Sequence, residues 1–179
     1  MRIDFEQDLI SDLPQSIIET ILINLPIRDA TDSQVLSIYL VLAVLIRYRL
    51  VATFLSRKDI KELVLQLGEG KWFRAPSSLF SCKNLNHLEL GRCELDPLPS
   101  FKGFFHLNYL NLQQVLILPY DIEFLIASYP LLESLTLSYF NSLELTVSAP
   151  NLKYLILEGE FKDICLVNTP LLVFISIAM

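Results

Sequence analysis

The sequence contains few of the residues that catalysis or a disulfide framework would need. It has three cysteines, two histidines and five glycines among 179 residues. Cys82, Cys93 and Cys165 are too few and too scattered for a disulfide framework or a zinc site, which favours an intracellular protein with reduced thiols. Neither histidine has a nucleophile or an acid placed to form a triad, and no phosphate-binding glycine motif occurs. We therefore predict no enzyme activity, no cofactor and no metal.

Basic residues are also scarce. The chain has fourteen Lys and Arg residues and twenty Asp and Glu residues, which gives a net charge of −6. The basic residues form no cluster in the sequence. This balance argues against nucleic acid and against an anionic membrane as partners. The opening stretch, MRIDFEQDLISDLPQ, is polar and acidic and does not resemble a secretory signal. We expect the protein in the nucleus or the cytoplasm.

Apolar residues, in contrast, are abundant. They make up 53% of the chain, and the mean hydropathy is +0.46, so nearly every element must bury one face. The longest apolar run, residues 35–46 (VLSIYLVLAVLI), is too short to span a bilayer, and Arg47 and Arg49 follow it closely. It predicts a buried helix or strand; a membrane segment and an abnormal sequence are the alternatives.

One pattern, Leu-x-x-Leu-x-Leu, recurs through the rest of the chain. Six copies begin at Ile60, Leu85, Leu107, Leu132, Leu152 and Leu172, with steps of 25, 22, 25, 20 and 20 residues. The copy at Leu85 extends through Cys93 to Leu95 as L-x-x-L-x-L-x-x-C-x-L. Steps of about 20–29 residues with this pattern are typical of leucine-rich repeats. The sequence therefore predicts an α/β solenoid with a parallel concave β-sheet.

Alternate residues of each short strand point to opposite faces, so the leucines form the core and the residues between them line the concave face. The outward residues form two rows across the strands. The first row is Glu62, His87, Tyr109, Ser134, Tyr154 and Phe174, and the second is Val64, Glu89, Asn111, Thr136, Ile156 and Ser176. Aromatic side chains beside polar ones suit a protein-binding surface, although any one of them could be an ordinary solvent-facing residue. All except Val64 and Ser176 are our candidate target-binding residues.

The segments between the strands differ with repeat length. Residues 120–130 (YDIEFLIASYP) predict a helix, and residues 76–82 (PSSLFSC) predict a helical turn. Residues 141–149 and 161–168, in the shorter repeats, alternate apolar and polar side chains and predict extended strands on the convex side. Pro130, Pro150 and Pro170 are expected to turn the chain into each concave strand and to occupy its first position.

Cys93 and the pair Trp72 and Phe73 each have a structural and a functional interpretation. Cys93 is expected to be a small buried hydrophobe, with a reactive thiol as the alternative. Trp72 and Phe73 are expected to pack on the core of the first repeat, with a role as partner anchors as the alternative.

Residues 8–30 (DLISDLPQSIIETILINLPIRDA) have a different character. Pro14 fits the first turn of a helix, and Pro26 ends that helix. Five apolar side chains then lie on one helical face: Ile17, Ile18, Ile21, Leu22 and Leu25. A short helix with such an apolar face must pack against another surface to bury it.

These stretches resemble plant F-box proteins with leucine-rich repeats, the F-box/FBD/LRR group. SDLPQSIIETILINLPIRDA is similar to the opening of an F-box, and CKNLNHLELGRCEL, YPLLESLTLSYF and SAPNLKYLILEGEFKDI are similar to the group's repeats. The resemblance implies a protein-interaction protein, the substrate-recognition subunit of an SCF-type ubiquitin ligase. It implies that the repeats hold a target protein. It also implies docking on a Skp-type adaptor through Leu13, Pro14, Ile17, Ile21, Leu25 and Pro26.

The chain departs from that group in two places. Residues 31–55 lack the serine-rich stretch and the Trp-Arg pair with which an F-box continues, and no FBD segment is present. We therefore divide the chain into a partial F-box-like segment (8–30), an apolar connecting segment (31–55) and a leucine-rich-repeat domain of about six repeats (56–179). The alternative functions are a stand-alone repeat module and a truncated decoy that cannot dock on the adaptor. A secreted or membrane-tethered receptor would need a signal peptide and capping cysteines, which the sequence does not show.

Overall fold

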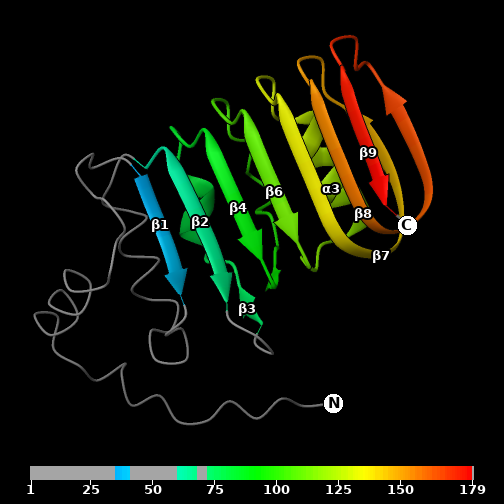
Figure 1. The fold of residues 1–179 in the computed structure, drawn as a ribbon. Helices are drawn as coiled ribbons and strands as arrows, with labels where there is room; N and C mark the ends of the chain where they lie inside the picture. Colours follow the sequence, from blue (N-terminus) through cyan, green and yellow to red (C-terminus); the bar gives the residue numbers. More distant parts are fainter. Residues whose placement is uncertain (1–34, 41–59, 68–71, 179) are drawn as a thin grey trace, which may run out of the picture.

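The computed structural model describes residues 35–40, 60–67 and 72–178, and its main feature is one twisted sheet of parallel strands (Figure 1). The sheet runs in the order β1-β2-β4-β6-β7-β8-β9. Its strands are β1 (Val35–Leu40), β2 (Glu62–Leu67), β4 (His87–Gly91), β6 (Tyr109–Gln113), β7 (Ser134–Ser148), β8 (Tyr154–Val167) and β9 (Phe174–Ala178). The predicted leucine-rich-repeat solenoid with its parallel concave sheet is confirmed.

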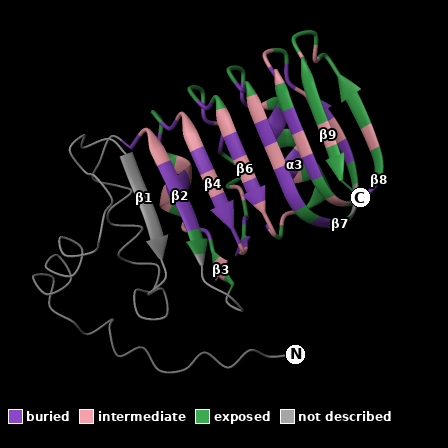
Figure 2. Ribbon diagram, viewed as in Figure 1, coloured by how far each residue is buried: buried purple, intermediate pink, exposed green. Residues whose placement is uncertain are grey.

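The register of the sheet follows the repeat pattern residue by residue. Leu63 pairs with Leu88, Leu88 with Leu110, and the column continues through Leu135 and Leu155 to the last strand. In β2 to β8 these inward leucines are at most 3% exposed and form one continuous core. Figure 2 shows the resulting alternation of buried and half-buried residues along the strands. Stacking identical coils is what buries a face that no single strand could bury alone.

A repeated hydrogen-bond pattern sets the start of each concave strand. The carbonyl oxygen of Asn108 accepts from the backbone N–H groups of both Glu133 and Ser134, at 2.8 and 3.0 Å. The same arrangement occurs one coil earlier at Asn86 and one coil later at Glu133. Each coil therefore fixes the position of the next one before the strands pair.

The convex side is built differently in the two halves of the solenoid. The long repeats return through a 3-10 helix, η1 (Ser77–Ser81), through the short pair β3 (Phe73–Arg74) and β5 (Cys93–Glu94), and through α3 (Pro119–Ala127). Figure 1 shows α3 behind the sheet. In the short repeats β7 and β8 continue past the concave face and pair again from Glu144↔Asp163 to Ser148↔Val167. The predicted helix, helical turn and convex strands are all found.

A residue with positive φ lies at the same place in the repeat in the coils of β4, β6, β7 and β8. Arg92, Gln114 and Tyr139 have φ of 55°, 53° and 61°, and Gly159 has φ of 133°. Each lies two residues after the last inward leucine of its coil. Positive φ is uncommon outside glycine, so four recurrences in register mark the corner where the chain leaves the concave sheet.

Several sequence expectations need correction or extension. The recurring prolines do turn the chain, but they lie in turns four residues before Ser134, Tyr154 and Phe174, so their expected place as the first strand residue was wrong. A strand's first residue pairs with the preceding coil, and these positions belong to the turn before that pairing begins. Trp72 is 49% exposed and does not pack in the core, whereas Phe73 does pack against it.

The apolar run is a strand where the structure describes it. Val35–Leu40 forms β1 and pairs in parallel with β2, from Val35↔Glu62 to Leu40↔Leu67. Residues 41–46 lie outside the described part of the chain. Among the described residues, no helix is long and apolar enough to cross a membrane.

The opposite edge of the sheet has an incompletely covered core. Ile175 and Ile177 of β9 are 45% and 44% exposed, although the same positions of β8, Leu155 and Leu157, are fully buried. Figure 2 shows this change as exposed residues across β9. The absence of a neighbouring coil against β9 in the described residues accounts for the difference, because each strand from β2 to β8 has a neighbour on both sides.

Candidate functional site

The concave face assembles the two rows that the sequence predicts. The pairing Glu62↔His87↔Tyr109↔Ser134↔Tyr154↔Phe174 forms the first row. The second is Val64↔Glu89↔Asn111↔Thr136↔Ile156↔Ser176 in the same register. Every candidate target-binding residue therefore lies beside its predicted neighbour. Their role in binding a target stays a prediction.

A third row, which the sequence reasoning missed, lies below these two. It consists of Gln66, Gly91, Gln113, Ser138, Glu158 and Ala178. The signal was available, because each member lies two residues after a member of the second row and strands alternate with period two. Gln66 Nε2 donates to Gln113 Oε1 at 3.1 Å, across the glycine that separates their strands. Ser138 Oγ donates to Glu158 Oε2 at 2.9 Å.

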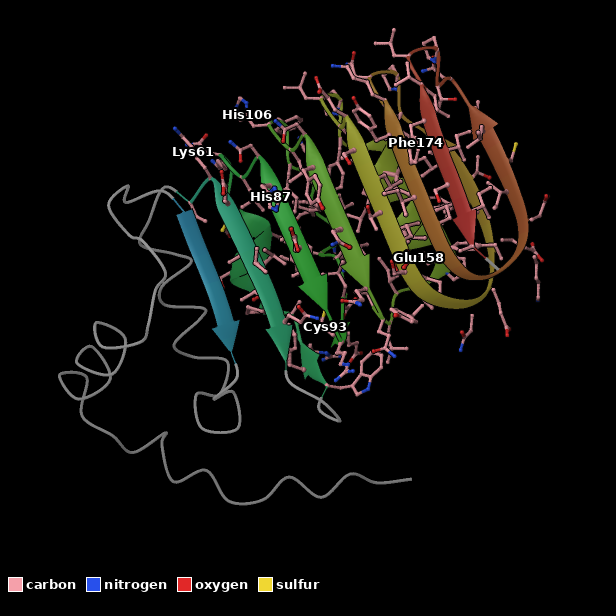
Figure 3. All side chains as sticks on the ribbon, in the orientation of Figure 1. Lys61, His87, Cys93, His106, Glu158 and Phe174 are labelled. Atoms are coloured by element: carbon pink, nitrogen blue, oxygen red, sulfur yellow. The ribbon has the colours of Figure 1, made fainter. Side chains whose placement is uncertain are left out.

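A cluster around His87 lies on the strands β4 and β6 (Figure 3). His87 Nε2 lies 2.8 Å from Glu89 Oε1, and the His87 ring stacks on Tyr109 with centroids 4.1 Å apart and planes within 4°. Burial raises the pKa of Tyr109, with a further contribution from the Glu89 carboxylate. The three side chains hold one another in fixed positions on an otherwise open surface. Rigid aromatic and polar groups of this kind suit protein recognition.

The other half of the concave face is more apolar. Tyr154 and Phe174, paired across β8 and β9, are 49% and 48% exposed. Ile156 is half-buried beside them. At the upper rim Lys153 Nζ lies 3.0 Å from Glu133 Oε1. Aromatic residues such as Tyr and Phe are enriched at protein–protein interfaces, so this half of the face also suits a protein partner.

The cysteines lie away from this face or are shielded. Burial raises the pKa of the Cys93 thiol to about 12 and that of Cys82 to about 11. Cys93 has no exposed surface, as expected for a small buried hydrophobe, and a reactive thiol there is disfavoured. Cys165 is exposed. In the described part of the chain, no three His, Cys, Asp or Glu side chains are grouped to hold a metal ion.

The adaptor-binding candidates Leu13, Pro14, Ile17, Ile21, Leu25 and Pro26 lie outside the described residues. Their role in adaptor binding therefore stays a prediction.

The stacked coils, the in-register leucine core and the open concave face define a leucine-rich-repeat solenoid. The model of the family described as "FBD-associated F-box protein At5g56370, LRR repeats" matches residues 50–178. The chain belongs to this family. The resemblance to the F-box/FBD/LRR group is thereby confirmed.

Two curated proteins of Arabidopsis thaliana are similar to the chain. F-box/FBD/LRR-repeat protein At1g13570 is 45% identical over 225 residues, covering 96% of this chain and 54% of the relative. F-box/FBD/LRR-repeat protein At3g26920 is 30% identical over 119 residues, covering 63% of this chain and 27% of the relative. The chain thus spans about half the length of the first relative and about a quarter of the second. No solved structure matches the chain.

Proposed function

We propose that the protein is a non-enzymatic interaction protein that holds a target on its concave face. The observation that carries this proposal is the register that brings three rows of outward side chains onto one rigid sheet. Family membership supports it, since the relatives are named for an F-box and leucine-rich repeats. A rigid parallel sheet suits recognition because its side chains lose little conformational freedom on binding.

We further propose that it acts as a substrate receptor of an SCF-type ubiquitin ligase, in the nucleus or the cytoplasm. The segment 8–30 would dock on a Skp-type adaptor through the apolar side chains of its predicted helix, and the solenoid would present the target. Ubiquitin transfer would then be carried out by other subunits of the ligase. The acidic chain makes nucleic acid and anionic membranes poor partners.

One structural observation favours the second candidate, a repeat module or decoy that does not dock. The strand β1 begins at Val35, and only four residues separate it from Ala30, where the F-box-like pattern ends. Residues 35–40 therefore belong to the solenoid sheet and are not available for the later helices of an F-box.

Co-purification with a plant Skp-type adaptor distinguishes the two candidates. The variant Leu13→Ala/Pro14→Ala/Leu25→Ala is the test, and Tyr154→Ala/Phe174→Ala on the concave face is the matched control. If the chain is a receptor, the adaptor binds the unchanged chain and the control but not the triple variant. A folded chain that fails to bind the adaptor would overturn the receptor function and leave the repeat module.

A further inference from the structure

Among Lys, Arg, Asp and Glu, only negatively charged side chains occur in the three rows of the concave face. Its three rows contain three carboxylates, those of Glu62, Glu89 and Glu158, and neither Lys nor Arg. Glu62 and Glu89 are diagonal neighbours on β2 and β4, on either side of the His87 position. Glu158 lies three strands further on and accepts from Ser138. The concave face is therefore acidic itself, in addition to the negative net charge of the whole chain.

Few donors in the described part of the chain reach the acceptors at the β2–β6 end of this face. Among the described residues, no Lys or Arg pairs with Glu62 or Glu89, and Glu89 contacts only the imidazole of His87. The side-chain oxygen of Asn111, Oδ1, next to Glu89 in the second row, is shielded from solvent and has no hydrogen-bond partner. An unpaired buried acceptor costs about 1–3 kcal/mol. The carboxylates of Glu62 and Glu89, in contrast, are only partly buried, so a cation supplied from outside can reach them.

The β8–β9 end of the same face offers apolar surface instead. Tyr154 and Phe174 are each about half exposed, and Figure 3 shows Phe174 on the β9 side of the sheet and His87 on β4. From β4 to β8 is three strand steps, which corresponds to about 14 Å at the usual spacing of about 4.8 Å. About four residues of extended chain span that distance.

From this arrangement we infer that the concave face takes a cationic peptide segment. A Lys or Arg side chain lies between Glu62 and Glu89, and an apolar side chain about four residues away packs on Tyr154 and Phe174. The charges are complementary to the acidic rows, and the same rows repel phosphate groups, which excludes nucleic acid as the occupant. This inference rests on the proposed target-binding function and names the chemistry of the target.

Selection from a displayed library of random peptides against the full chain tests the inference. The enriched peptides are expected to carry Lys or Arg, with an aromatic or aliphatic residue about four positions away. Their affinity, measured by fluorescence anisotropy, is expected to fall about tenfold in Glu62→Gln/Glu89→Gln, which corresponds to about 1.4 kcal/mol. It is also expected to fall with rising salt concentration, because the contacts are partly exposed.

A matched control removes the same charge elsewhere. Glu144→Gln/Glu160→Gln neutralises two exposed carboxylates outside the three concave rows, and it should leave the affinity unchanged. Equal weakening in both double variants would show a general charge effect and overturn the inference.

Two other outcomes separate this inference from the proposed function. Selected peptides that lose binding in Tyr154→Ala/Phe174→Ala but show no enrichment of Lys or Arg would overturn the cationic chemistry and leave target binding intact. If peptides bind but none depends on any concave residue, both the inference and the proposed role of the face are wrong.

Discussion

At the scale of single residues, two glycines of the same sheet, Gly91 on β4 and Gly159 on β8, have opposite requirements. Gly159 has φ of 133°, and a Cβ added there would lie 2.5 Å from the backbone oxygen of Phe140. Gly91 has an ordinary φ, and its added Cβ would meet only the Gln66 side chain, at 2.8 Å. Backbone cannot move aside without breaking the β7–β8 pairing, whereas a glutamine side chain can rotate.

We therefore predict that Gly159→Ala destabilises the fold by at least about 2 kcal/mol and that Gly91→Ala changes it by less than about 0.5 kcal/mol. Gly91→Ala should instead break the hydrogen bond between Gln66 and Gln113. Urea unfolding of both variants is the measurement. Equal destabilisation of the two would show that the corner at Gly159 is not constrained as described.

Because the Cys93 thiol is buried, we predict that the fold loses stability at alkaline pH. Burial raises its pKa from an ordinary value of 9.0 to about 12, so above pH 9 the unfolded chain releases this proton and the folded chain keeps it. The contribution of the thiol to stability is complete below pH 9 and is lost between pH 9 and 12. From pH 8 to pH 10 the loss from this group is about 1.3 kcal/mol.

Cys93→Ala removes that contribution. The free energy of unfolding of the variant should therefore fall less between pH 8 and pH 10 than that of the unchanged chain, by about 1.3 kcal/mol. Chemical denaturation at the two pH values measures both differences. A pH dependence that the substitution leaves unaltered would mean that the thiol is not shielded in solution.

At the scale of elements, the concave strands could be predicted because the repeat fixes both their position and their register. Leu135 and Leu155 occupy the same place in the pattern and pair as it implies. The convex strands followed from the alternation in residues 141–149 and 161–168, and α3 followed from helical spacing. Local periodicity was sufficient wherever an element buries one face against the same core.

The features that could not be predicted depend on contacts between coils or on backbone conformation. The exposure of Trp72 depends on what the neighbouring coils leave uncovered, and nothing in the local pattern signals it. The left-handed corner is occupied by Arg, Gln and Tyr as well as Gly, so composition did not mark it. The interaction of Gln66 with Gln113 spans 47 residues and joins strands that are not adjacent.

The same position in successive coils should respond differently to the same truncation. Leu155 is fully buried between two coils, whereas its equivalent Ile175 is 45% exposed. We predict that Leu155→Ala costs about 3 kcal/mol, through lost burial and the cavity left behind. Ile175→Ala should cost about 1 kcal/mol, in proportion to its smaller buried area.

Thermal or urea unfolding of the two variants measures the difference. The substitutions remove similar numbers of carbon atoms, so each serves as the control for the other. A cost for Ile175→Ala as large as that for Leu155→Ala would mean that another surface covers β9 in solution.

At the scale of the whole molecule, each coil contacts mainly the coils before and after it. The strands pair only with sequence neighbours in the order of the repeats, from β2 through β9. Stability in such a molecule is approximately a sum of coil and interface contributions. The coil that ends in β9 has one such interface in the described residues, so local opening is expected to begin there.

The two kinds of convex connection also determine curvature. Where β7 and β8 pair on both sides of the solenoid, the coils have the same spacing of about 4.8 Å on either face, and the stack stays nearly straight. Where α3 fills the convex side, a cylinder about 10 Å wide separates the coils there while the concave strands remain about 4.8 Å apart. The stack must bend at that point. A bound partner would therefore meet an arched surface over β6 and β7 and a flatter one over β8 and β9.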